Sequence, residues 1–131
     1  MRQRIGNSYK KPKGGIMIFD LSKAKIFIRP GATDLRKAAN GLSMIVQETM
    51  KQDPFSGSAY LFCNSGRNLL KAVYWDKTGF WLSQKRLEEG KYPWPKSAGE
   101  AMELTEGELR MLLSGVDFFK AHKEVFYKRV A

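Results

Sequence analysis

Residues 59–86 read AYLFCNSGRNLLKAVYWDKTGFWLSQKR. Three runs rich in aliphatic and aromatic residues lie in this stretch, in the order Ala59–Cys63, Leu69–Trp75 and Phe80–Lys85. Turn-forming residues separate the runs, at Asn64–Arg67 and at Asp76–Gly79. Short apolar runs joined by tight polar turns are typical of β-hairpins. The stretch therefore predicts three consecutive antiparallel strands.

The central run predicts a sheet that is apolar on both faces. Side chains alternate across a strand, so Leu69, Lys71, Val73 and Trp75 would share one face, and Leu70, Ala72 and Tyr74 the other. Sheets with two apolar faces are covered on both sides in folded proteins. We therefore expect other elements to cover much of both faces.

The segment 34–51 has the clearest helical periodicity and is the expected cover for one face. Its apolar side chains recur at Leu35, Ala39, Leu42, Ile45, Val46 and Met50. Thr33 is a suitable N-cap residue, and Asp34 would lie in the first turn. Gly41 in a helix interior costs about 1 kcal/mol relative to Ala, and close packing on the sheet would be one reason to accept it.

Shorter elements flank this core. Lys23–Ile28 has strand character, and the prolines of Tyr92–Pro95 exclude a central strand there. Ser97–Glu103 is predicted to be a loop with a short strand. Thr105 and Glu108 match a capping box, which predicts a short helix over 105–113.

Together these elements predict an α+β fold in a single domain. We expect an antiparallel sheet of about four or five strands, covered by one long helix, plus a short C-terminal helix. Composition assigns 1–16 to a flexible basic tail, because this segment has little apolar surface. The domain is expected over 17–117, and 118–131 is a basic, aromatic C-terminal tail.

The composition excludes several classes of protein. The chain has 131 residues, one cysteine and one histidine, so an internal disulfide and multi-cysteine or multi-histidine metal sites are excluded within one chain. No apolar run is long enough for a membrane span or a secretory signal. We expect a cytoplasmic protein that uses no cofactor, has no membrane partner and has no evident small-molecule substrate.

The formal net charge of +10 points to a polyanionic partner, most often nucleic acid. The first candidate contacts are Arg29, Arg36 and Lys37, which flank a loop that leads into the predicted helix. Cations and free backbone N–H groups at such a position can hold a DNA phosphate. The alternative is structural: Thr33 and Asp34 cap the helix, and Arg36 pairs with a carboxylate.

Two further groups of residues are candidate DNA contacts. The second group interleaves cations with aromatic residues, and consists of Lys85, Arg86, Lys91, Tyr92 and Trp94. Such a pattern can grip a backbone and stack on exposed bases. In the alternative interpretation, Trp94 anchors the core, and Lys85 and Arg86 form a solvated strand end. The third group, Arg67, Lys71 and Lys77, would extend a basic face.

Catalysis has little support in the sequence. A two-metal nuclease needs two or three converging carboxylates. The available acids are Asp34, Asp53, Asp76, Glu88 and Glu89, and a cap or a turn accounts for each. Cys63 ends a predicted strand and is expected to be a small buried hydrophobe, and His122 has no evident partner. We therefore expect a protein that is not an enzyme and has no metal site.

An ordered set of motifs resembles a known family. The motifs are Thr33–Lys37, Gly41–Leu42, Asp53–Gly57, Trp75–Asp76, Gly79–Phe80, Lys85–Glu88, Gly90 and Trp94–Pro95. This set closely resembles the second-open-reading-frame accessory proteins, called TnpB, of the insertion-sequence-sixty-six family of bacterial transposons. The resemblance covers about Met17 to Asp117.

The resemblance implies a role in transposition beside a separate, larger transposase that carries the cutting chemistry. It supplies no known catalytic residue. Our leading hypothesis is a non-catalytic accessory protein that binds DNA mainly through phosphates and aids the transposase, with other transposon-encoded proteins as further partners. The alternative is a protein–protein adaptor of the transposase complex with little direct DNA contact. A metal-dependent nuclease is the third hypothesis.

Overall fold

A computed structural model describes residues 24–97 and 99–115. The elements, in chain order, are β1 (Ile26–Ile28), α1 (Ala39–Glu48), β2 (Ala59–Cys63), β3 (Leu69–Asp76), β4 (Gly79–Arg86), β5 (Met102–Leu104) and α2 (Glu106–Leu113). The tails predicted over 1–16 and 118–131 lie outside the described residues. None of the described helices is long and apolar enough to cross a membrane.

The strands form one five-stranded sheet in the order β4-β3-β2-β1-β5. The two hairpins predicted from residues 59–86 are confirmed: β2–β3 and β3–β4 pair antiparallel. The prediction of a purely antiparallel sheet is wrong, because β1 and β2 run parallel, with Ile26 opposite Ala59. The chain crosses over through α1 between these two strands and therefore enters β2 in the same direction as β1.

Helix α1 is shorter than the predicted helix over 34–51, and Thr33 does not cap it. The N-cap residue is Ala38, which makes no side-chain cap. Thr33 instead donates its backbone N–H to the Cys63 carbonyl at 2.8 Å. The Lys71 ammonium donates to the Leu35 carbonyl at 2.6 Å. These long-range bonds hold the preceding segment against the sheet, so the helix begins only at Ala39.

Gly41 does not owe its place to close packing on the sheet. A Cβ atom built on Gly41 would lie 3.1 Å from Cβ of Lys37, and its other near neighbours are atoms of that same side chain. The tight neighbour of Gly41 is therefore the Lys37 side chain that precedes the helix.

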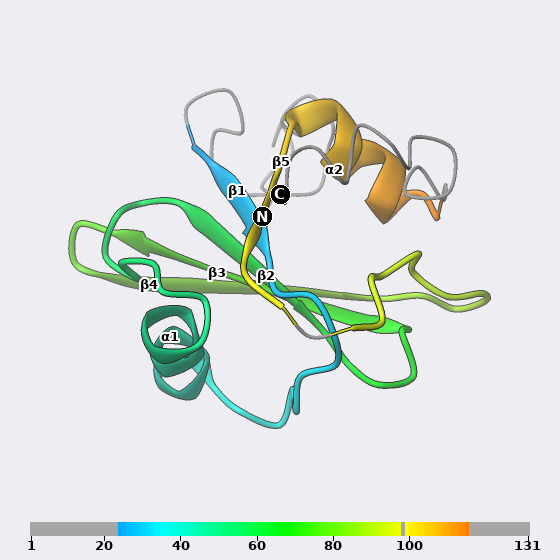
Figure 1. Cartoon of the computed structure of the whole chain (residues 1–131), viewed down its shortest axis with the longest axis horizontal. Helices are drawn as coiled ribbons and strands as arrows, with labels where there is room; N and C mark the ends of the chain where they lie inside the picture. Colours follow the sequence, from blue (N-terminus) through cyan, green and yellow to red (C-terminus); the bar gives the residue numbers. More distant parts are fainter. Residues whose placement is uncertain (1–23, 98, 116–131) are drawn as a thin grey trace, which may run out of the picture.

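The two faces of the sheet carry separate cores, as the alternation predicts, and Figure 1 shows α1 and α2 on opposite sides of the sheet. The α1 side buries Leu35, Leu42, Val46, Met50, Tyr60, Phe62 and Val73. The α2 side buries Ile26, Ile28, Ala59, Leu61, Cys63, Leu70, Ala72, Tyr92, Trp94, Leu104, Leu109, Leu112 and Leu113. The short α2 and an extended segment around Tyr92 and Trp94 thus cover this face of the sheet together.

The capping box at the start of α2 is confirmed. The Thr105 hydroxyl accepts the Glu108 backbone N–H at 3.1 Å, and the Glu108 carboxylate accepts the Thr105 backbone N–H at 2.9 Å. This reciprocal pair satisfies two N–H groups that a helix start leaves free. The helix ends at Leu113, and Gly115 follows with a left-handed φ of 87°.

Candidate nucleic-acid interface

Three loops meet at one end of the sheet, where the parallel strands β1 and β2 both finish. We call residues 29–38, 64–68 and 86–96 the three-loop end. Backbone bonds join the loops: Gly31 donates to the Pro95 carbonyl at 2.8 Å, and Tyr92 donates to the Arg67 carbonyl at 2.7 Å. The Thr33–Cys63 bond ties the first loop to the end of β2. Segments far apart in the sequence therefore form one bonded surface.

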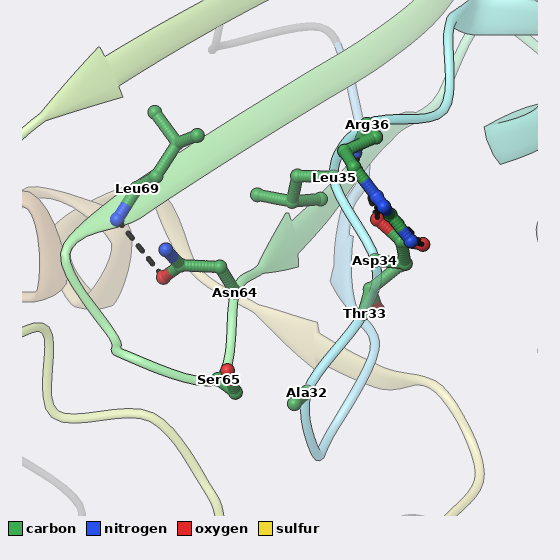
Figure 2. A pocket seen from close by; sticks show the side chains of 8 residues that line it. All are labelled: Ala32, Thr33, Asp34, Leu35, Arg36, Asn64, Ser65 and Leu69. Atoms are coloured by element: carbon green, nitrogen blue, oxygen red, sulfur yellow. Dashed lines mark hydrogen bonds and ion pairs between the residues drawn. The ribbon is translucent and has the colours of Figure 1, made fainter.

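Two adjoining hollows lie on this surface. The larger has a volume of about 490 Å³, and Figure 2 shows it between the loop at Ala32–Arg36 and the turn at Asn64–Leu69. The smaller has a volume of about 260 Å³ and includes Arg67 and Lys96 in its lining. Ala32, Asn64 and Ser65 line both. Backbone, hydroxyl and cationic groups around shallow hollows suit the oxygen atoms of a phosphate backbone.

Positive charge dominates the three-loop end. Its cations are Arg29, Arg36, Lys37, Arg67, Arg86, Lys91 and Lys96, and its carboxylates are Asp34, Glu88 and Glu89. Arg86, Lys91 and Lys37 are exposed, and each is therefore accessible to a ligand in solution. Clustered cations on one surface are the electrostatic signature of nucleic-acid binding.

Arg36 is partly engaged within its own loop. Its guanidinium forms a two-point contact with Asp34, at 2.9 Å from Nε and 2.7 Å from the terminal nitrogen. This contact holds the pKa of the Asp34 carboxyl well below its usual range. The pairing of Arg36 with a carboxylate is thus confirmed, although Asp34 lies before the helix and not in its first turn.

Arg29 braces the first loop. Its guanidinium donates to the Ala32 carbonyl at 3.0 Å and to the Thr33 hydroxyl at 2.9 Å. Its Nε atom is buried with no hydrogen-bond partner among the described residues. Arg29 therefore holds in place Ala32 and Thr33, two residues that line the larger hollow.

Tyr92 and Trp94 are core residues and not base-stacking platforms. Their exposed fractions are 0% and 4%. The Tyr92 hydroxyl donates to the Lys85 carbonyl at 3.0 Å, and burial raises the pKa of Tyr92 to about 12. The Trp94 indole donates to the carbonyls of Arg29 and Gly31, at 2.9 and 3.1 Å. The aromatic part of the second candidate group is therefore corrected: these rings support the loops from beneath.

Two of the candidate lysines serve the fold. Lys71 donates to the carbonyls of Leu35 and Lys37, at 2.6 and 3.4 Å. Lys85 reaches across to the Leu113 carbonyl at 3.3 Å, at the end of α2. Both ammonium groups donate hydrogen bonds to backbone carbonyls, so neither belongs to the free cations of the three-loop end.

Lys77 lies at the opposite end of the sheet. In the β3–β4 hairpin, Leu69 is opposite Arg86 at one end, and Asp76 is opposite Gly79 at the other. Leu69 and Asp76 are seven positions apart along β3, which corresponds to roughly 24 Å. The structure therefore does not bring Lys77 together with the other candidate cations.

Sequence reasoning missed Asn64 and Lys96. The Asn64 side-chain oxygen accepts the backbone N–H groups of Asn68 and Leu69, at 3.0 and 3.1 Å, and its amide donates to the Asn68 side chain at 2.8 Å. These bonds fix the turn between the hollows. An Asn at the start of a tight turn is the signal that could have indicated this role. No local pattern marks Lys96, which a distant loop brings into place.

The other reactive side chains of the described residues do not come together in a catalytic arrangement. Cys63 is fully buried, and burial raises the pKa of its thiol to about 12. Within 24–97 and 99–115, no group of three or more His, Cys, Asp or Glu residues is placed to hold a metal ion. His122 lies outside the described residues.

Comparison with known proteins gives one family and two relatives. The family profile described as IS66 Orf2 like protein matches residues 24–123. Uncharacterized protein y4hO of Sinorhizobium fredii is 35% identical over 94 residues, covering 72% of this chain and 82% of that protein. Uncharacterized protein y4jC of the same organism is 29% identical over 100 residues, covering 76% and 86%. No solved structure gives a significant match.

Proposed function

The chain belongs to the IS66 Orf2-like family, and from this premise we propose that it is a non-catalytic accessory protein of DNA transposition that binds DNA phosphates through the three-loop end. The family associates the chain with insertion sequences and their transposition. The gathering of cations from three separate loops around the two hollows is the observation that supports DNA as the ligand. A separate transposase would carry out the cutting, in the cytoplasm.

The proposed contacts are electrostatic and independent of base sequence. Arg67 and Lys96 line the smaller hollow, and Arg86 and Lys91 are exposed cations of the segment 86–96. Phosphate contacts position a protein on DNA without reading its bases. Each phosphate that a cation neutralises releases counterions, so the affinity should fall steeply as salt is raised.

Fluorescence anisotropy across a salt series tests this function. The probes are the terminal duplex of the element and a shuffled duplex of the same length, with and without residues 1–16 of the protein. We expect binding that weakens with salt and survives the deletion. An affinity that does not change with salt would contradict phosphate binding. If the protein no longer bound DNA once residues 1–16 were deleted, the DNA contacts would lie outside the three-loop end.

A protein–protein adaptor with little DNA contact is the second candidate function. The observation in its favour is apolar surface on β4, where Trp81 and Leu82 are 46% and 39% exposed. Co-purification with the transposase of the element tests it. Failure to retain any transposon-encoded protein would count against the adaptor.

A further inference from the structure

Among the described residues, β4 is an eight-residue strand at one edge of the sheet. It ends the sheet order, and no strand of the described chain pairs with that edge. The opposite edge is the three-residue β5, which is too short to offer a long template. Proteins usually protect long edges with proline, bulges or charged side chains, and in β4 the charged side chains are confined to Lys85 and Arg86 at one end. The middle of β4 has none of these protections, and instead exposes Trp81 and Leu82.

The hydrogen-bond alternation shows which backbone groups face outward. Leu87 donates to the Asn68 carbonyl at 2.8 Å and lies opposite Asn68 by extension of the register. Hydrogen-bonded and non-hydrogen-bonded pairs alternate along an antiparallel ladder. The residues of β4 whose backbone groups face away from β3 are therefore Phe80, Leu82, Gln84 and Arg86.

The neighbouring ladder gives the same result. Asn64 donates to the Leu69 carbonyl at 3.1 Å, so alternate β3 residues from Leu69 onward bond to β2. The residues between them, such as Leu70 and Ala72, remain to bond with Lys85 and Ser83 of β4. Two independent bonds thus assign the same outward-facing set.

We propose that this edge pairs antiparallel with β4 of a second copy of the chain, about a twofold axis through Ser83. Self-pairing requires outward-facing residues to lie opposite one another. Only one register pairs all four of them: Phe80 opposite Arg86 of the second copy, and Leu82 opposite Gln84 of the second copy. The contact is isologous, so it closes as a dimer and does not propagate.

Side-chain complementarity in this register supports a second copy as the occupant. Phe80 lies across from Arg86 of the second copy, so a cation meets an aromatic ring there. Trp81 lies across from Lys85 of the second copy, whose ammonium is held by its own Leu113 carbonyl and whose aliphatic stem is left to face the indole. Such pairs are favourable between neighbouring strands.

A disulfide at the twofold axis tests the register. In the proposed ladder Ser83 faces Ser83 of the second copy as a non-hydrogen-bonded pair, with Cα atoms about 4.5 Å apart. Disulfides accept this separation. In the full chain, we expect Ser83→Cys to oxidise to a covalent dimer at least tenfold faster than Gln84→Cys. The native Cys63 thiol does not compete, because it is buried. Equal rates, or no covalent dimer, would overturn the proposal.

A proline substitution tests the edge independently. Gln84→Pro removes one outward N–H and no bond to β3, whereas Gln84→Ala loses the side chain alone. Sedimentation equilibrium should show a species of twice the chain mass of 14.9 kDa, with a dissociation constant at least tenfold weaker for the proline variant. A wild-type chain that stays monomeric, or equal constants for folded variants, would contradict the proposal.

Salt separates this inference from DNA binding. Two chains of net charge +10 repel each other, and salt screens this repulsion. Dimer affinity should therefore hold or rise between about 0.1 and 0.5 M salt, while DNA affinity falls. A dimer that dissociates as salt is raised would contradict pairing by backbone bonds, and would leave the proposed DNA interface unaffected.

Discussion

Several single side chains hold the loops of the candidate interface in position. Asn64 fixes the turn between the two hollows, and Arg29 braces the loop on the other side. Trp94 holds that loop from beneath through two backbone carbonyls. Because buried and half-buried polar groups position the loops, the exposed cations are free to contact a ligand. The rigidity of the surface thus depends on residues that make no proposed contact with DNA.

Replacement of Asn64 should destabilise the protein. In Asn64→Ala, the backbone N–H groups of Asn68 and Leu69 lose their acceptor, and we expect the free energy of unfolding to fall by about 1–3 kcal/mol. Urea denaturation followed by circular dichroism measures this. Asn40→Ala, at an exposed position of α1, is the matched control and should change stability little. Equal effects of the two substitutions would contradict the role assigned to Asn64.

Stability should fall in alkaline solution because of two buried groups. Burial raises the pKa of Cys63 from 9.0 to about 12, and that of Tyr92 from 10.0 to about 12. Above about pH 9 the unfolded chain releases protons that the folded chain retains, so the free energy of unfolding decreases as pH rises. Denaturation at about pH 8 and about pH 10.5 measures the decrease. Cys63→Ala should show a smaller decrease, and an unchanged decrease would contradict this cause.

Helices and strands that depend on interactions between residues close in the sequence could be predicted, and those that depend on distant residues could not. Strands β2, β3 and β4 could be predicted because alternation and turn residues encode hairpins locally. The helix start could not, because the bonds of Thr33 to Cys63 and of Lys71 to Leu35 join distant segments. The parallel β1–β2 pair could not be predicted either, because it joins two strands that the crossover through α1 separates in the sequence.

The candidate site also has features that the sequence predicts and features that only the folded chain determines. Its cations are visible in the sequence, but their grouping depends on loops that meet only in the folded chain. A sequence pattern of cations interleaved with aromatic residues is the same whether the rings are exposed or buried. In the structure Tyr92 and Trp94 are buried, so they support the loops and do not offer a stacking surface. The seven-residue separation along the hairpin likewise placed Lys77 far from the loops.

The capping box of α2 offers a test at this scale. Thr105→Ala removes the acceptor of the Glu108 N–H, and we expect it to cost about 1 kcal/mol of stability. Thr105→Ser retains a hydroxyl at the same position and should cost much less. Thermal or urea unfolding of the pair measures the difference. Equal stability of the Ala and Ser variants would show that the cap does not stabilise the helix.

The whole molecule places two different surfaces at different positions around one sheet. Cations gather on the three-loop end, whereas the far end of the β3–β4 hairpin carries a cluster of Phe55, Trp75 and Phe80 with ring centroids 5.0–5.5 Å apart. The outer edge of β4 runs between these ends. A twofold pair through that edge would place the basic end of each copy beside the aromatic end of the other. DNA contact and self-association therefore share Arg86, at the end of β4, and otherwise use different parts of the fold.

Salt dependence of DNA binding tests the central claim most directly, with charge removed at either end of the sheet. Arg67 and Lys77 both have left-handed backbones, with φ of 58° and 48°, so Gln replacements strain them alike. For Arg67→Gln combined with Lys96→Gln, we predict that the slope of log affinity against log salt becomes shallower by about one for each phosphate that the variant no longer neutralises. Lys77→Gln should leave the slope unchanged. A slope reduced equally by Lys77→Gln, or untouched by the double variant, would contradict a DNA interface at the three-loop end.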